Sequence, residues 1–418
     1  MRTGVFLIGA LLLAWCLAAC SAGDDADDDD LVDDDADDDS GDDDISDDDA
    51  DDDAEDDDTA DDDSVDDDAD DDSADDDSID DDSIDDDSVD DDSADDDSAD
   101  DDSADDDAAD DDELSDTELF AVGRQGTILH FDGASWSPMT SPTLLDIGSV
   151  WGASLTDVYA IANNSYVESL LLHYDGNSWS TMSTPTLTGV AIREIWGSSA
   201  SDIFAVGFAG VQDALEGVIL HYDGVSWTLT ELGDEVDLYS VWGSSPTDVF
   251  AVGVTDVGFR IYHYDGTDWT LMEEDTDHAY ALCVWGTSST DVFVGGSIMG
   301  AGYLISAVYQ YDGSSWELTA TIDDYGMITT MWGSSSSNVF AGEAYYLGLY
   351  RFLHYDGANW SGSSSPNLGD IWGTSSTNVF IVGEEGLIKR FNGVAWTAMD
   401  SGTESSLYGL WGARRSAQ

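Results

Sequence analysis

Three short motifs, each present seven times, constrain the fold of this chain more than any other feature of its sequence. They follow one another in a fixed order between residues 113 and 418: a Trp-Gly pair, a run resembling Val-Phe-Ala-Val-Gly, and a turn resembling Asp-Gly-x-Ser-Trp. Successive copies lie about 36 to 48 residues apart, a spacing typical of folds built from repeated supersecondary units. The Trp-Gly pairs begin at Trp151, Trp196, Trp242, Trp285, Trp332, Trp372 and Trp411, and the second tryptophans are Trp136, Trp179, Trp227, Trp269, Trp316, Trp360 and Trp396.

Each repeat contains four short runs that have the composition of β-strands. In the third repeat these runs cover residues 193–197, 202–207, 217–223 and 226–232, and they are rich in β-branched and aromatic residues. Clusters of Gly, Ser, Asp and Thr separate them, and the Asp-Gly pairs accept the positive φ angles of a tight hairpin turn. Helical periodicity is absent. The sequence therefore predicts an all-β fold, a seven-bladed β-propeller of four-stranded blades.

The two ends of the repeat region predict how the ring closes. Residues 118–136 lack a Trp-Gly strand, whereas residues 406–412 supply one with nothing after it. We expect the C-terminal strand to complete the first blade, which removes the exposed edges of an open array.

At these motifs the chain resembles known bacterial proteins. The Val-Phe-Ala-Val-Gly and Asp-Gly-x-Ser-Trp halves, over residues 118–400, look like kelch-like and Asp-box-like (BNR-like) propeller repeats. They are also similar to β-propeller repeat lipoproteins with acidic stalks. The kelch Gly pair occurs only at Gly295-Gly296, and the Asp-box spacing of Gly and the aromatic residue is shifted by one. The resemblance therefore implies an architecture and no particular activity.

The N-terminal segment predicts an anchored, exported protein. Residues 1–19 combine Arg2 with an apolar run too short for a comfortable membrane span, as in a signal peptide. The run ends in Leu-Ala-Ala-Cys, which looks like a bacterial lipobox, so the resemblance implies lipidation at Cys20; a signal peptide with an incidental cysteine is the alternative. Ser21 favours transfer to the outer membrane, on what is known of lipoprotein families.

Residues 20–112 form an Asp-rich segment with 57 Asp, one Glu and no Lys or Arg. Such a chain buries too little apolar surface to offset its ordering entropy, so we expect a disordered stalk. Weak Ca²⁺ binding is expected only as a by-product, because the repeat lacks the turn-forming Gly and fixed geometry of a tight site. The remaining 37 acidic and eight basic residues give residues 113–418 a net charge of −29, which argues against nucleic acid as a partner.

Residues that recur in every blade are expected to be structural. Both sets of tryptophans are interpreted as packing elements between neighbouring blades. The histidines His130, His173, His221, His263 and His354 share one column with Gln310 and Arg390, and such equivalent positions lie too far apart around a ring to bind one metal.

Function is expected in the loops that differ between blades. Connections between second and third strands, and between blades, should lie on one face around the mouth of the central channel, where they vary in length and content. The candidate ligand-binding residues are the acidic Asp234, Glu235, Asp237, Glu273, Glu274, Asp275, Asp277, Asp323 and Asp324, with the aromatic Tyr303 and Tyr345. Two alternatives are open for Glu273 to Asp277: a Ca²⁺ site, or an acidic rim that is exposed to solvent. Whether a metal binds there is left open.

These features predict a monomeric cell-envelope lipoprotein, surface-exposed at the outer membrane, that binds an extracellular or periplasmic protein or glycan. No catalytic residue is assigned. The alternative is a glycan-processing hydrolase or lyase with its site at the channel mouth. A sialidase-like site would need several arginines converging with a Tyr and an acid. Arg193 or Arg260 meeting a Tyr and a Glu in one pocket would favour that alternative.

Overall fold

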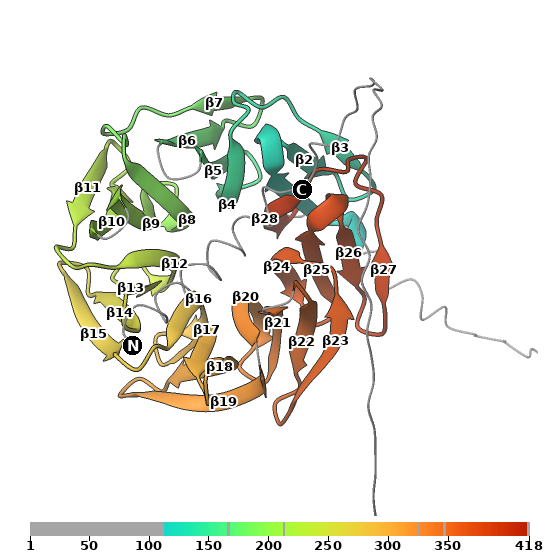
Figure 1. The fold of residues 1–418 in the computed structure, drawn as a ribbon. Helices are drawn as coiled ribbons and strands as arrows, with labels where there is room; N and C mark the ends of the chain where they lie inside the picture. Colours follow the sequence, from blue (N-terminus) through green and yellow to red (C-terminus); the bar gives the residue numbers. More distant parts are fainter. Residues whose placement is uncertain (1–112, 165–167, 212–213, 325, 346–347, 416–418) are drawn as a thin grey trace, which may run out of the picture. The chain divides into compact units, whose positions relative to one another are not determined.

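A computed structural model describes residues 113–164, 168–211, 214–324, 326–345 and 348–415. The predicted signal peptide, Cys20 and the Asp-rich segment lie outside the described residues. Within the described ranges, 28 strands form seven antiparallel sheets of four strands each, arranged as a ring (Figure 1). The predicted all-β, seven-bladed propeller is confirmed.

We number the blades in ring order from the one that contains both ends of the repeat region. Blade 1 has the strand order β28-β1-β2-β3, and blades 2 to 7 take β4–β7, β8–β11, β12–β15, β16–β19, β20–β23 and β24–β27 in turn. The innermost strands are β28 (Leu407–Arg414), β4 (Asp146–Ser154), β8 (Val190–Ser199), β12 (Asp237–Ser245), β16 (Tyr280–Ser288), β20 (Gly326–Ser335) and β24 (Leu368–Ser375). The second strands are β1 (Thr117–Gly123), β5 (Asp157–Asn164), β9 (Asp202–Val211), β13 (Asp248–Val254), β17 (Asp291–Met299), β21 (Asn338–Tyr345) and β25 (Asn378–Gly383).

The outer half of each blade is shorter and more exposed. The third strands are β2 (Ile128–Phe131), β6 (Glu168–Tyr174), β10 (Ala214–Tyr222), β14 (Phe259–Tyr264), β18 (Leu304–Tyr311), β22 (Tyr350–Tyr355) and β26 (Ile388–Phe391). The outermost strands are β3 (Trp136–Pro138), β7 (Trp179–Thr181), β11 (Trp227–Glu231), β15 (Trp269–Asp275), β19 (Trp316–Asp324), β23 (Trp360–Ser365) and β27 (Trp396–Ala398). Short 3₁₀ turns, η1 (Arg124–Gly126) and η2 (Glu384–Gly386), join the second and third strands of blades 1 and 7. The described residues contain no helix long and apolar enough to cross a membrane.

The Trp-Gly pair is the contact between neighbouring innermost strands. A Cβ added to Gly243 in blade 4 would lie 2.6 Å from the indole of Trp196 in blade 3, and five other Trp-Gly glycines face the indole of the preceding blade equally closely. At Gly412 the Trp372 indole is 3.2 Å away, and Leu119 and Glu118 of the same blade are closer. Only glycine leaves room for that close approach. The motif recurs because each of the seven seams needs one indole and one bare backbone.

The second tryptophan also bridges blades. Trp269 of blade 4 meets the ring of Phe204 in blade 3 edge-on, with centroids 5.9 Å apart, and Trp316 meets Phe250 at 6.1 Å in the next seam. The largest fully buried side chains include these phenylalanines, so the core is a circle of interblade clusters. The prediction that both sets of tryptophans pack between blades agrees with this geometry.

Each side chain of the histidine column forms a hydrogen bond within its own blade. His221 Nε2 lies 2.8 Å from Asp202 Oδ1, and its ring stacks on Phe204 with a centroid separation of 4.2 Å. Gln310 replaces the histidine in blade 5 and donates to Asp291 at 2.8 Å. An amide can substitute for the imidazole because the position requires only a hydrogen bond to the residue that opens the second strand.

Ring closure follows the predicted pairing. Strand β28 is antiparallel to β1, from Thr117 opposite Arg414 to Gly123 opposite Leu407. Arg414 binds the carboxylate of Glu113, and Arg415 binds Glu118 and the carbonyl oxygens of Ser115 and Asp132. The first and last described segments therefore hold each other.

Candidate functional site

The antiparallel order of each blade sorts its connections onto two faces. The turns between first and second strands, and between third and fourth strands, lie on one face, which we call the fixed face. Connections between second and third strands, and between blades, lie on the opposite face, which we call the variable face. The fixed face is built from repeated turns, in which an Asp such as Asp223 accepts the N–H groups two and three residues later at 2.9 and 2.8 Å.

The structure corrects the prediction that the acidic candidates lie in loops. Glu273, Glu274 and Asp275 end β15, and Asp237 begins β12. Asp323 and Asp324 end β19, although their side chains lie outside the described residues. One of these acids has a basic cross-strand partner, since Glu274 stands directly opposite Arg260 of β14. Of the acidic candidates, Asp234, Glu235 and Asp277 lie in connections.

Asp237 is the acceptor of an interblade ion pair. Arg193 of blade 3 donates from Nε to Asp237 Oδ1 at 2.8 Å and from Nη2 to Oδ2 at 2.6 Å. The two side chains are only 15% and 12% exposed, and the guanidinium lies 4.2 Å from the ring centroid of Tyr239. Because both oxygens are occupied, this carboxylate holds blades 3 and 4 together near the variable face.

A second arginine neutralises two more candidates. Arg260 lies 3.4 Å from Asp234 and 3.6 Å from Glu274, while Tyr262 donates its hydroxyl to Asp234 at 2.8 Å. This is the arginine, tyrosine and glutamate grouping that would favour an enzyme. Burial and the Asp234 carboxylate raise the pKa of Tyr262, however, so the phenol is a poorer nucleophile than usual. Arg193 is engaged with a different carboxylate, and the two arginines do not converge.

The other candidates occupy separate places. Glu235, Glu273 and Asp277 are exposed, and Asp275 accepts the N–H of Asp277 at 2.7 Å. Tyr303 is half-buried in the connection between β17 and β18. Among the described residues no group of three or more His, Cys, Asp or Glu side chains could hold a metal ion. Asp275 and Asp277 are instead joined by a hydrogen bond within a turn.

The most distinctive feature of the variable face is a groove of about 470 Å³ at the seam between blades 6 and 7, which we call the 6/7 groove. It is lined by the ends of β21 and β23, the start of β22 and the turn that follows β25, so it lies away from the ring axis. Its described lining comprises Tyr345, Gly348, Leu349, Tyr350, Arg351, Ser364, Ser365, Pro366, Asn367 and Glu384. Of the predicted ligand-binding residues, Tyr345 contributes to this described lining.

A buried network fixes the arginine of the 6/7 groove. Arg351 donates from Nη1 to Tyr345 Oη at 2.6 Å, and the same nitrogen lies 3.6 Å from Oε2 of Glu343. Glu343 is 2% exposed and accepts the hydroxyl of Ser306 from blade 5. Burial raises the pKa of Glu343, an effect that hydrogen bonds from Ser306 and Tyr345 oppose.

Blade 6 departs from the repeat at each position that builds this network. The position of Glu343 is Gly in five other blades and Ala162 in blade 2. The position of Arg351 is Thr127, Leu170, Val218, Ala307 or Leu387 in five blades, and Arg260 in blade 4. Gly362 leaves room for the guanidinium, because a Cβ there would lie 2.3 Å from Arg351 Nη2. The ligand-binding candidates chosen from the sequence did not include Glu343, Arg351, Asn367 or Glu384, although alignment of the repeats against one another exposes the first two.

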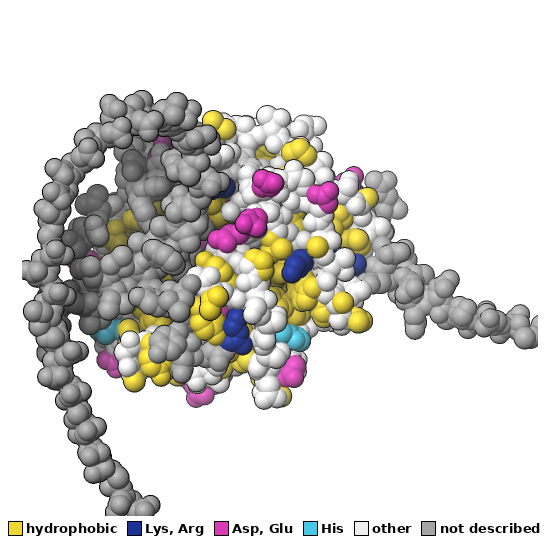
Figure 2. All heavy atoms as spheres, turned by 45° about the vertical axis from the view of Figure 1, so that its right-hand side comes forward, with side chains coloured by type: hydrophobic (Ala, Val, Ile, Leu, Met, Phe, Trp, Pro, Cys, Tyr) yellow, Lys and Arg dark blue, Asp and Glu magenta, His cyan; other side chains and the backbone are white. Residues whose placement is uncertain are grey.

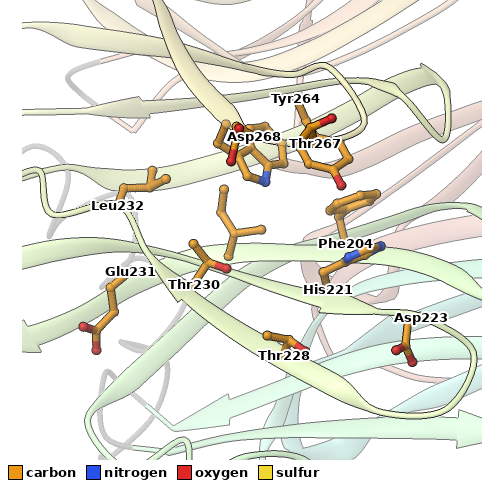
Figure 3. Close-up of a pocket in the computed structure, with 12 residues that line it drawn as sticks. Phe204, His221, Asp223, Thr228, Thr230, Glu231, Leu232, Tyr264, Thr267 and Asp268 are labelled. Carbon is orange, nitrogen blue, oxygen red and sulfur yellow. The ribbon is translucent and has the colours of Figure 1, made fainter.

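A second groove, of about 460 Å³, lies on the outer rim between blades 3 and 4 (Figure 3). Phe204 and His221 lie together in it, with Tyr264 across the seam and Thr228 and Thr230 along β11. Trp269, at the start of β15, also lines the groove from blade 4. Phe204, His221, Tyr264 and Trp269 have counterparts in the repeats of other blades, so the residues that build the seam also build most of this groove. The 6/7 groove, by contrast, includes Arg351, whose position is an arginine in one other blade, blade 4.

Two acids lie at the ring axis among the innermost strands. Glu194 and Asp370 each stand two residues before a Trp-Gly pair, where other blades carry Ser149, Ser240, Cys283, Thr330 and Gly409. Glu194 accepts the N–H of Val241 at 2.7 Å, and Asp370 accepts that of Leu410 at 2.9 Å. Burial raises the pKa of Glu194 to about 7 and that of Asp370 to about 6. Both carboxylates bond the next blade, which makes them structural contacts.

Acidic side chains are scattered over the flank seen in Figure 2, with few Lys or Arg among them. This distribution follows the excess of acidic residues in the propeller. A net charge of −29 gives the propeller a negative field that disfavours anionic ligands.

Solved structures resemble this chain in fold. A putative 6-phosphogluconolactonase from Bacteroides fragilis is 10% identical, with a TM-score of 0.54 over 72% of this chain and 98% of that one. A protein from Lactobacillus plantarum is 8% identical, with a TM-score of 0.53 over 72% and 99% of the two chains. YCF48 from Cyanidioschyzon merolae is 15% identical, with a TM-score of 0.48 over 66% and 91%. No protein-family model matches, and no curated protein matches either. The likenesses to the first two structures show the fold alone, and the seven described sheets define the class as a seven-bladed β-propeller.

Proposed function

We propose that this chain is a cell-envelope lipoprotein that displays its propeller and binds a protein or glycan through the variable face. The observation that carries the binding proposal is the 6/7 groove. Blade 6 replaces a small residue by Glu343 and a small or apolar one by Arg351, and its Gly362 leaves room for that arginine. Burying a carboxylate and an arginine costs free energy, and five other blades build this position without either residue. The two residues therefore favour a binding role over a packing role.

The experiment for binding is an array of glycans and peptides probed with the full chain in detergent. We expect at least one class to bind, and Arg351→Leu, which introduces the residue that blades 2 and 7 carry at this position, to weaken that binding. Binding of no array member, or binding that is unchanged in this variant, would contradict the proposal. Thermal unfolding of the variant shows whether the blade remains folded.

The anchoring proposal depends on the Leu-Ala-Ala-Cys ending and on the acidic segment that follows it. Metabolic labelling with a radioactive fatty acid should label the wild-type chain and leave Cys20→Ala unlabelled. Protease treatment of intact cells should remove the propeller if it is displayed on the surface. A labelled Cys20→Ala chain would refute lipidation at that residue, and a fully protected propeller would refute surface display.

A glycan-processing enzyme is the second candidate, and the grouping of Glu343, Tyr345 and Arg351 is what favours it. Only one arginine reaches this place, so a convergent arginine set is not formed among the described residues. Tyr345→Phe separates the two functions. An enzyme that uses the phenol as a nucleophile would lose turnover of its bound glycan, whereas a binding module would release that glycan unchanged before and after the substitution.

A further inference from the structure

We infer that the 6/7 groove is a binding site for a neutral saccharide. This inference rests on the proposed function and names the ligand class of the same site. It is drawn from the hydrogen-bonding groups, the charges and the apolar surface that the groove presents.

The 6/7 groove presents hydrogen-bond acceptors next to serine hydroxyls. Asn367 donates from Nδ2 to Glu384 Oε1 at 3.0 Å, and the backbone N–H of Glu384 donates to the carbonyl of Asn367 at 3.1 Å. The pair is therefore fixed from two sides. Among the described residues nothing donates to Asn367 Oδ1 or Glu384 Oε2, which leaves two neighbouring acceptors. Ser364 and Ser365 add hydroxyls that both donate and accept.

The charges of the groove exclude an anionic ligand. Arg351 is the only Lys or Arg in its described lining, and Glu343 lies behind that arginine. Glu384 then remains as an acid without a described basic partner, inside a propeller with a net charge of −29. A carboxylate, sulfate or phosphate ligand would meet a net negative site and a negative field.

The apolar surface of the groove suits the C–H face of a sugar ring. Tyr345 and Tyr350 contribute phenol rings, Pro366 adds a rigid apolar edge, and Leu349 is 63% exposed. Aromatic faces beside a few placed acceptors are how a concave site orients a ligand that has one apolar and one hydroxyl-bearing side. A lysine-rich peptide fits less well, because it would find only one carboxylate without a basic partner.

The test uses the full chain in detergent on one array carrying neutral glycans, sialylated and sulfated glycans, and basic peptides. We expect neutral glycans to bind, with an affinity that is unchanged between about 0.05 and 0.5 M NaCl because no net charge is paired. Ligand-observed NMR then measures the same glycan in solution with three variants. Asn367→Ala should weaken binding about tenfold, and Tyr350→Ala should weaken it by a similar factor. Thr230→Ala, in the rim groove between blades 3 and 4, should leave it unchanged.

The outcomes separate this inference from the proposed function. Binding only of peptides or charged glycans, or neutral-glycan binding that Thr230→Ala weakens and Asn367→Ala does not, would overturn the saccharide site and leave a ligand-binding propeller. Binding of no array member would overturn both. If Asn367→Ala or Tyr350→Ala melts at a lower temperature than the wild type, Glu384→Gln replaces it, since that change keeps the size of the side chain and removes its charge. The Glu384→Gln variant should bind a neutral saccharide with several-fold lower affinity, and an unchanged affinity would contradict the inference.

Discussion

At the scale of single residues, glycine in the Trp-Gly pair is required by space. The Cβ that alanine would add at Gly243 lies 2.6 Å from the Trp196 indole and 2.8 Å from the carbonyl oxygen of Asp248. We expect Gly243→Ala to lower the free energy of unfolding by about 1–3 kcal/mol through overpacking, measured by urea denaturation. Gly148→Ala is the matched control on an innermost strand, because its Cβ meets only Asn163 Nδ2 at 3.9 Å. Equal losses in the two variants would mean that the indole contact is not the cause.

Glu194 supplies a prediction about pH. Burial raises its pKa to about 7, Asp370 adds to the rise, and hydrogen bonds from Ser240 and Val241 oppose it. Between about pH 4.5 and 7 the folded chain retains a proton that the unfolded chain has lost, so stability falls as pH increases through this window. Glu194→Gln keeps an acceptor for Val241 without the charge. It should unfold like the wild type near pH 5 and be more stable by about 2 kcal/mol near pH 8.

Urea titrations near pH 5 and near pH 8 test this expectation, with the exposed Glu235→Gln as the control for loss of one surface charge. A Glu194→Gln variant that is less stable than the wild type near pH 8 would show that the carboxylate is stabilising when charged. The effect should not vanish with salt, because the cause is burial and not long-range repulsion.

At the scale of secondary-structure elements, the ion pair between Arg193 and Asp237 connects the innermost strands β8 and β12. Both side chains are largely buried and joined by two hydrogen bonds. Asp237→Ala leaves the guanidinium without its carboxylate, and we expect a loss of about 2 kcal/mol in the free energy of unfolding. Glu274→Ala removes a longer, more exposed pair with Arg260, at 3.6 Å and 51% exposure for the glutamate. That control should lose at most about 1 kcal/mol. Similar losses in both would contradict the structural importance of the first pair.

The elements also show what could be predicted from the sequence and what could not. Strand number, blade order and closure followed from residues repeated in every blade, because packing at seven equivalent seams imposes the same choice seven times. The acidic loop residues were misplaced because Glu274 and Asp237 look like loop residues until Arg260 and Arg193 stand beside them. Those partners are 14 and 44 positions away in the sequence. Glu343 was not chosen as a ligand-binding candidate because its importance depends on Arg351 across the strand pair, although its departure from a repeated glycine was visible.

At the scale of the propeller, the C-terminal strand β28 closes the ring by pairing with β1. Removing β28 takes away seven residue pairs with β1, the Trp411 indole against Gly152, and the Leu410 N–H that Asp370 accepts. Blade 1 would keep three strands and expose the inner edge of β1, a template for aggregation. We therefore expect a chain ending at residue 404 to lose its cooperative thermal transition. Replacing Arg414 and Arg415 by Ala should have a much smaller effect, because those ion pairs lie at the surface.

The same seam should close when the strand is supplied as a separate molecule. A synthetic peptide of residues 405–418 carries every residue of β28, and its docking surface on β1 and β4 is formed by the other strands. Added to the truncated chain, it should restore a cooperative transition whose midpoint increases with peptide concentration, because binding to the folded state stabilises that state by mass action. A peptide with Trp411→Ala should restore less, since it leaves the space above Gly152 unfilled. A truncated chain that melts like the full chain without any peptide would show that closure by β28 does not hold the propeller together.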